Sequence, residues 1–173
     1  MLPSSASAAS TPLNSLLAPY AGQVRVRVGG LLLRGGSLLL AAHRGLLPDG
    51  VPFWSPPGGG WTFGESLKAA LVREFEEETG LRVRVGRFLH LHEFKQGILQ
   101  ALELFFEVIA EDEQAPPKLG HDPEHAADEQ LLTELRWLTP RELLVLSPAQ
   151  VHSVLRLVLS VDDLFVPQVH FAD

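Results

Sequence analysis

Two segments of the chain alternate apolar and polar residues with a period of two. Residues 23–33 read QVRVRVGGLLL and residues 81–94 read LRVRVGRFLHLHEF, a period that is typical of strands with one buried face. Residues 45–60 are rich in Pro and Gly, and residues 111–130 are almost all polar, so we expect loops there. Three further apolar runs have the length of strands: residues 37–44, 100–111 and 134–138.

The helical signals lie between and after these strands. Residues 65–79 have a helical period and are closed by a glycine. Residues 139–142 read TPRE, a capping box with Pro at the first helical position. Residues 147–165 predict a last amphipathic helix. Strands on both sides of a helix, with further helices at the end, predict an α/β/α sandwich with a mixed central sheet.

Composition limits the possible partners. The 173 residues carry a net charge of −7, which argues against non-specific binding to nucleic acid. Cysteine is absent, which excludes disulfides and thiolate metal sites and is compatible with the cytoplasm, our predicted location. No apolar run approaches the roughly 18 residues of a membrane span, so we expect no membrane partner.

The start of the chain differs from the rest. Residues 1–24 have no charged side chain and are rich in Ser, Ala and Pro. They contain neither the basic start nor the continuous apolar stretch of a secretory signal. We therefore expect a flexible arm at residues 1–20 and a single domain at residues 21–173. The arm is a possible contact in a homodimer.

Residues 74–78 read EFEEE, which crowds four carboxylates into five positions. At about 100° per residue, Glu74, Glu77 and Glu78 fall on the side of the apolar stripe of Leu67, Leu71 and Phe75. Glu76 falls opposite. A solvated charged face would lie opposite the stripe, and the C-terminal end of a helix is its negative end. The inward acids therefore predict a site for a hard divalent cation, Mg²⁺ or Mn²⁺.

The surrounding segment resembles the signature of the Nudix hydrolases, G-x5-E-x7-R-E-U-x-E-E-x-G-U, where U is a bulky apolar residue. The positions are filled by Gly59, Glu65, Arg73, Glu74, Phe75, Glu77, Glu78, Gly80 and Leu81. An aromatic residue stands at Phe75, where aliphatic residues are commoner. The order of the predicted elements over residues 22–160 also fits the Nudix α/β/α sandwich.

The resemblance implies an activity and a set of roles. The family hydrolyses nucleoside diphosphates linked to another group, with divalent metal assistance. By resemblance, Glu74, Glu77 and Glu78 bind the metals, Gly58 adds its backbone carbonyl, and Arg73 orients the acids. Glu74 is a catalytic base in some members, and Glu65 supports the loop and the helix. Backbone can approach the metals closely in the glycine-rich turn.

The substrate is a nucleotide, and several kinds fit. Nucleotide sugars, ADP-ribose, dinucleoside polyphosphates and nucleoside triphosphates are all candidates. The alternative function is a non-catalytic Nudix-fold module that binds a nucleotide as a regulator. Such modules usually lose signature acids, whereas this chain keeps all of them.

Many relatives carry a further acid on the loop before the last strand, as base or metal ligand. In this chain we choose Glu129 for that role and Glu124 second, as a residue at the substrate. A solvated acidic loop is the alternative for both. His121 and His125 flank Glu124 and leave the same two possibilities open.

Other candidates lie on or near the first strands. Of Arg25, Arg27, Arg34 and Arg44, we choose Arg44 as the residue that holds a substrate phosphate, because it ends the apolar strand before the glycine-rich loop. Trp54 can stack on a base or pack in the core. His90 and His92 share one face of a strand, where they reach substrate or lie without a role.

Overall fold

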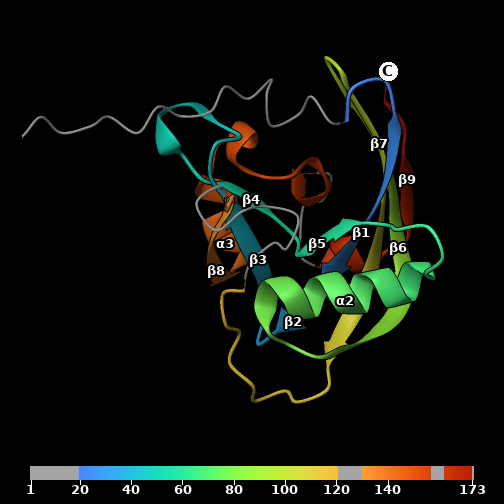
Figure 1. Ribbon diagram of the computed structural model, residues 1–173. Coiled ribbons are helices and arrows are strands. Elements are labelled where there is room, and N and C mark those ends of the chain that lie inside the picture. Colours follow the sequence, from blue (N-terminus) through green and yellow to red (C-terminus); the bar gives the residue numbers. More distant parts are fainter. Residues whose placement is uncertain (1–19, 121–129, 157–161, 173) are drawn as a thin grey trace, which may run out of the picture.

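The computed structural model describes residues 20–120, 130–156 and 162–172 (Figure 1). Its strands are β1 Val24–Leu31, β2 Leu33–Arg34, β3 Ser37–His43, β4 Phe53–Ser55, β5 Gly58–Gly60, β6 Val83–Gln96, β7 Leu99–Ala110, β8 Leu132–Leu138 and β9 Gln168–His170. Its helices are α2 Leu67–Thr79 and α3 Pro140–Val145. Four 3-10 turns accompany them, at Pro48–Gly50, Pro148–Gln150, Ser153–Arg156 and Asp162–Phe165.

The described strands form two sheets. The larger has the order β5-β1-β7-β6-β9, and the smaller joins β2, β3 and β4 with β8 paired to β3. In the larger sheet β1 runs parallel to β7 and β6 parallel to β9, whereas β1–β5 and β6–β7 are antiparallel. The predicted α/β fold with a mixed central sheet is confirmed.

Helix α2 forms where the sequence predicts it and begins two residues later, because Ser66 is its N-cap. The Ser66 side chain accepts a hydrogen bond from the Ala69 N–H at 3.1 Å. The helix ends at Gly80, whose φ of 64° is unstrained only for glycine. The amides of Lys118 and Gly120 then donate to the last carbonyls, those of Thr79 and Glu78, at 2.8 and 2.9 Å. Both ends of α2 are thus fixed by hydrogen bonds to residues outside the helix.

The apolar stripe of α2 packs on one face of the larger sheet (Figure 1). Leu71 and Phe75 are 0% exposed, and they share a core cluster with Val28 of β1 and Phe106 of β7. Full burial of side chains of this size contributes about 1.5–3 kcal/mol each. A Cβ on Gly30 would collide with the Phe75 ring, so glycine allows the close approach of helix and sheet.

The other face of the larger sheet is covered by the smaller sheet and the C-terminal segment. A second core cluster joins Leu31 and Phe105 to Leu40 of β3 and to Val154 and Leu164 near the end of the chain. The larger sheet is therefore buried on both faces, as the sandwich predicts.

The prediction of one continuous helix at residues 147–165 is wrong for the part that is described. Only 3-10 turns form there, and residues 157–161 lie outside the described residues. Val151 has an extended backbone (φ −126°, ψ 144°) and makes a parallel bridge with Trp54. The His152 N–H donates to the Trp54 carbonyl at 2.8 Å. These long-range hydrogen bonds replace the helical ones.

The predicted loop at residues 45–60 also needs correction, because it contains β4 and β5. Strand β5 consists of three glycines and pairs with β1 at Arg27, Val28 and Gly29. A Cβ on Gly58, which has a φ of 147°, would overlap the Val28 carbonyl oxygen. Only glycine fits this pairing, so the composition that suggests a loop here makes a strand.

Two later predictions hold. Strand β8 contains the predicted residues 134–138, and α3 has the predicted capping box, in which the Thr139 hydroxyl accepts from the Glu142 N–H at 3.3 Å. Residues 111–120 lie outside helices and strands, as expected for the polar loop. Residues 121–129, with Glu124, Glu129, His121 and His125, lie outside the described residues.

The predicted N-terminal arm also lies outside the described residues, except for Tyr20, whose ring is 3.6 Å from the Arg25 guanidinium carbon. The division into an arm at residues 1–20 and a domain at residues 21–173 therefore stays a prediction. None of the described helices has the length and apolar character that crossing a membrane requires.

Candidate active site

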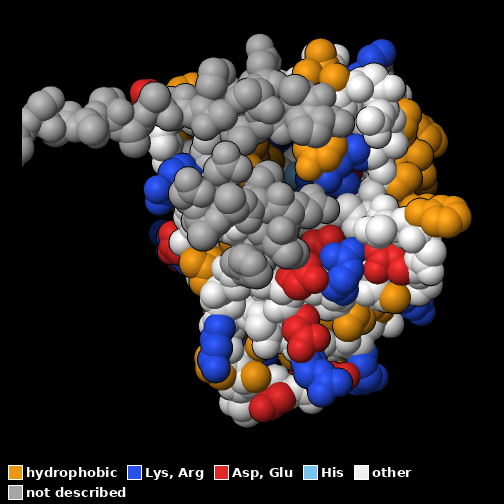
Figure 2. Space-filling model, in the orientation of Figure 1, with side chains coloured by type: hydrophobic (Ala, Val, Ile, Leu, Met, Phe, Trp, Pro, Cys, Tyr) orange, Lys and Arg blue, Asp and Glu red, His pale blue; other side chains and the backbone are white. Residues whose placement is uncertain are grey.

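The acids of α2 are sorted by depth as the helical period predicts. Glu78 is buried at 7% exposure, and the side chains of Glu74 and Glu77 are 12% and 29% exposed. Glu76 is exposed to solvent. Figure 2 shows acidic and basic side chains side by side over α2. Three carboxylates thus continue the buried side of the helix.

Arg73 is the cation at the centre of this group. Its guanidinium lies 2.8 Å from Glu65, 2.8 Å from Glu74 and 3.2 Å from Glu77. It also donates to the Gly60 carbonyl at 3.3 Å. The hydrogen bond to Glu65 outweighs burial and raises the pKa of Arg73, and the same bond lowers the pKa of Glu65. One guanidinium therefore orients three carboxylates and ties them to β5.

The glycine strand β5 lies directly against these acids. The Gly58 N–H donates to Glu78 Oε2 at 2.9 Å. A Cβ on Gly59 would overlap the Glu74 carboxylate. Glycine thus leaves the space that Glu74 occupies, and it brings main-chain atoms within reach of two acids at once.

This group of residues fits a divalent cation. Its donors are carboxylate oxygens next to main-chain carbonyls, the set that Mg²⁺ and Mn²⁺ prefer. One arginine faces Glu65, Glu74 and Glu77, and Glu77 and Glu78 lie in the last turn of α2, at the negative end of the helix dipole. The surplus of negative charge favours a bound cation.

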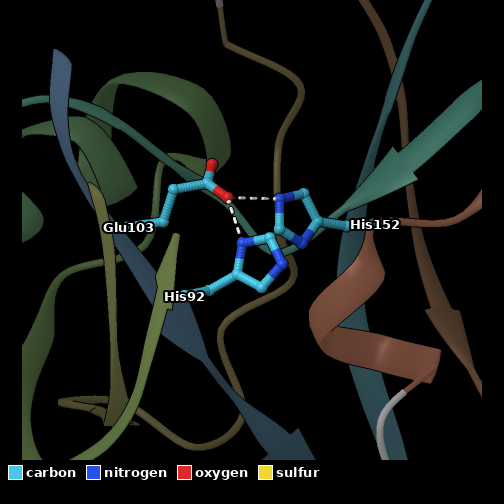
Figure 3. Close-up of side chains that lie close together, drawn as sticks. All are labelled: His92, Glu103 and His152. Atoms are coloured by element: carbon cyan, nitrogen blue, oxygen red, sulfur yellow. Dashed lines mark hydrogen bonds and ion pairs between the residues drawn. The ribbon is translucent and has the colours of Figure 1, made fainter. Parts of the chain in front are cut away.

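A second group of possible metal ligands lies within the described ranges, made of His92, Glu103 and His152 (Figure 3). Both imidazoles approach the same carboxylate oxygen: His92 Nδ1 is 3.0 Å and His152 Nε2 is 2.9 Å from Glu103 Oε2. His92 Nε2 is 2.8 Å from the Ser153 hydroxyl. Two nitrogens and an oxygen are ligands that zinc accepts.

The hydrogen bonds of this trio are complete without an ion. The Val154 N–H donates to His152 Nδ1 at 3.2 Å, and the other ring nitrogen, Nε2, donates to Glu103. Burial alone would raise the pKa of the Glu103 carboxyl. The charge and hydrogen bond of His152, the hydrogen bond of His92 and the charge of Arg27 instead hold it well below its usual range.

A sequence model of the NUDIX domain matches residues 23–158 of the chain, which is more than half of its length. The chain belongs to the Nudix family. The predicted Nudix hydrolase is thus confirmed at the level of the family, and its members generally use divalent metals and act on small nucleotide substrates.

Solved structures share this Nudix fold. The structure of a UDP-X diphosphatase matches with a TM-score of 0.61 and 18% identity, over 92% of this chain and 73% of that one. A MutT Nudix hydrolase from Burkholderia pseudomallei matches with a TM-score of 0.59 and 22% identity, over 78% and 95%. An ADP-ribose pyrophosphatase from Streptococcus suis matches with a TM-score of 0.53 and 16% identity, over 86% and 98%.

The other residues proposed from the sequence are spread over this Nudix domain. Trp54 is 3% exposed and belongs to the core between the sheets, which favours the packing alternative. Arg44 is exposed at the end of β3, and its N–H donates to the Leu131 carbonyl at 2.8 Å. His90 and His92 are buried at 0% and 8% exposure, so neither is a surface residue.

Sequence reasoning overlooked Glu103 and His152. Glu103 interrupts the apolar strand β7, and a buried acid in such a strand needs a partner. The buried acid in an apolar strand was visible in the sequence. Its partner His152 lies in a segment predicted to be helical, and only the fold brings His152 to Glu103. The pairing therefore could not be read from spacing.

Proposed function

We propose that this Nudix enzyme hydrolyses a pyrophosphate bond in a nucleoside diphosphate linked to another moiety, with Mg²⁺ or Mn²⁺ as cofactor. The observation that carries the proposal is the gathering of acids of α2 beside the glycine strand β5: Arg73 is the shared cation of Glu74 and Glu77, and Glu78 accepts from the Gly58 N–H. A pyrophosphate and this site both carry negative charge and repel each other, so bound cations are needed for the substrate to bind.

Each residue has a role in this proposal. Glu74, Glu77, Glu78 and the Gly58 carbonyl hold the metals, which neutralise the phosphates and lower the pKa of water when bound. Arg73 keeps the carboxylates in position, because its guanidinium contacts Glu65, Glu74 and Glu77 together. Glu74 or Glu129 takes the proton of the attacking water.

The substrate class is bounded by the family. The similar structures include proteins named UDP-X diphosphatase and ADP-ribose pyrophosphatase, and we propose nucleotide sugars and ADP-ribose as the first substrates to test. Arg44, Glu124 and Trp54 stay proposals as substrate contacts. The cytoplasmic location, the homodimer and the lack of nucleic acid binding likewise stay predictions.

The test is a panel of nucleotide substrates incubated with the protein and Mg²⁺ or Mn²⁺, with the products identified. Glu74→Gln is the inactive comparison and Glu76→Gln is the matched control, since Glu76 is an exposed acid of the same helix. We expect the parent and the Glu76 variant to cleave a common substrate. No turnover of any substrate, or equal rates for Glu74→Gln and the parent, would contradict the proposal. Binding without turnover would favour the regulatory module.

A further inference from the structure

A row of polar residues crosses the larger sheet from edge to edge. Neighbouring strands align Gly60 of β5, Arg27 of β1, Glu103 of β7, His92 of β6 and His170 of β9. Directly paired residues project from the same face of a sheet. The glycine at the end of the row has no side chain, so Arg27 is the last side chain before the edge that carries β5.

This row lies on the face that α2 does not cover. A Cβ on Gly29 would meet Phe105, which belongs to the core under the smaller sheet, whereas a Cβ on Gly30 would meet Phe75 of α2. Residues two apart in a strand share a face, so Arg27 projects with Gly29. Arg27 and the acids of α2 therefore approach β5 from opposite sides.

Arg27 has unused hydrogen-bonding capacity. Its Nη2 is 3.4 Å from the Gly58 carbonyl oxygen, which is long for a hydrogen bond. Its Nε is buried and has no hydrogen-bond partner among the described residues. A buried donor without a partner costs free energy. A ligand that offered anionic oxygens would satisfy both nitrogens, because a guanidinium fork matches a phosphate.

Glu103 lies beside Arg27 on the same face of the sheet. It is the cross-strand neighbour of Arg27, and the charge of Arg27 acts on it. Both imidazoles of the trio bind Glu103 Oε2, and Figure 3 shows the other carboxylate oxygen turned away from the two rings. Glu103 is thereby held by β6 and by the C-terminal segment together, and it gives Arg27 a fixed counter-charge.

The backbone of Gly58 joins this row to the candidate metal site. Its N–H donates to Glu78 Oε2 at 2.9 Å, and its carbonyl oxygen faces Arg27 Nη2 at 3.4 Å. A pyrophosphate bound to metal ions at Gly58 would lie beside Arg27. We propose that Arg27 binds a phosphate oxygen of the substrate and that Glu103 is its positioning residue, a proposal that rests on the proposed pyrophosphohydrolase function.

The experiment compares steady-state kinetics of Arg27→Gln and Arg27→Lys on the cleaved substrate. The matched control is Arg25→Gln, which removes the same charge two residues earlier in β1, where the guanidinium lies over the Tyr20 ring. We expect Arg27→Gln to raise KM about tenfold or more, since it removes a charge-assisted hydrogen bond. We expect partial recovery in Arg27→Lys, which restores the charge without the fork, and little change in the control.

A second measurement does not depend on turnover. Calorimetric titration of magnesium pyrophosphate into the parent and the two glutamine variants should show about tenfold weaker binding for Arg27→Gln alone. An equal loss of affinity in Arg25→Gln would overturn the proposal, because it would mean that only long-range charge acts. Unchanged KM and unchanged affinity in Arg27→Gln would overturn it as well. A parent that hydrolyses no substrate would refute the proposed function, and the titration would still test Arg27.

The role of Glu103 is tested by a double-mutant cycle. Glu103→Gln should raise KM severalfold, and Arg27→Gln should add little to it, because Glu103 acts on the substrate through Arg27. Circular dichroism and thermal unfolding check that each variant is folded. Additive effects of the two changes on KM would overturn the positioning role while leaving the role of Arg27 to the single variants.

Discussion

The two clusters of charged residues on opposite faces of the larger sheet differ in their ratio of acidic to basic side chains. On the α2 side, one arginine faces Glu65, Glu74 and Glu77, and Glu78 joins them at Gly58. On the other side, Glu103 alone receives two imidazoles and lies beside Arg27. Four carboxylates thus gather around one arginine on the α2 side, whereas one carboxylate has several donors on the other.

This difference separates two uses of buried acids. A surplus of carboxylates attracts metal ions, because each added cation relieves repulsion. A single carboxylate with several donors forms a fixed network, which positions a neighbouring group. Ligand type alone would favour the histidine trio as the metal site, whereas the number of carboxylates favours the acids of α2, the site that we propose. The following changes test that distinction, from the largest effect to the smallest.

Removal of divalent metal should abolish hydrolysis. Exhaustive chelation should reduce turnover to background, and added Mg²⁺ should restore it, because the acids of α2 cannot bind a pyrophosphate without cations. Glu78→Gln should lower kcat about 100-fold or more, and the exposed Glu76→Gln should not. Full activity in the presence of the chelator would show that the surplus of acids has another purpose.

Loss of the shared cation should have the next largest effect. Arg73→Gln frees three carboxylates from their common partner, and we expect kcat/KM to fall about 10- to 100-fold. Arg73→Lys should recover only part of this loss, because an ammonium cannot form the fork. Rates equal to the parent in Arg73→Gln would mean that the acids hold their positions by packing alone.

Glu103→Gln should lower stability in addition to its effect on KM. The carboxylate is buried and charged, and loss of its hydrogen bonds should lower the free energy of unfolding by about 2 kcal/mol at pH 7. The pKa of Glu103 is lowered in the folded protein, so its contribution is present above about pH 4.3, its unfolded pKa, and is lost as the pH falls below it. The free energy of unfolding, measured with urea between pH 6 and pH 3, should therefore depend less steeply on pH in the variant than in the parent.

His90 should give the smallest effect. Burial lowers its pKa, and the hydrogen bond between Nε2 and the Leu164 carbonyl offsets this only in part. The folded pKa lies below the unfolded value of about 6.5, so the unfolded state binds more protons and stability falls as the pH falls through this window. His90→Gln should reduce the difference in unfolding free energy between pH 7.5 and pH 5.5. If the difference in unfolding free energy is unchanged, the pH dependence of stability comes from other groups such as His170, whose pKa is also lowered by burial.

The parts of the fold that depend on local signals were predictable. The depth of each α2 acid follows from the helical period, and the C-terminal end of α2 follows from Gly80; its start was predicted two residues too early because the Ser66 cap was overlooked. Strand β5 was missed because three glycines become a strand only through pairing with β1. The last helix was wrong because Val151 pairs with Trp54, nearly a hundred residues earlier in the chain. Neither pairing leaves a periodic pattern.

The site divides in the same way. The signature acids lie on one helix, so their spacing was enough to bring them together. The row from Arg27 to His92 depends on the register of β1, β7 and β6, which the sequence does not specify by itself. The choice of Arg44 over Arg27 rested on chain position alone.

The backbone of Gly58 links the acids of α2 to the polar row on the other face of the sheet. It touches the acids through its N–H and the arginine row through its carbonyl, and main-chain atoms are the same whatever residues surround them. If Arg27 binds a substrate phosphate as we propose, substitutions at position 27 would alter how the substrate is held without moving the carboxylates of α2. A designer could therefore diversify position 27 and keep the buried network of Glu103 and the acids of α2.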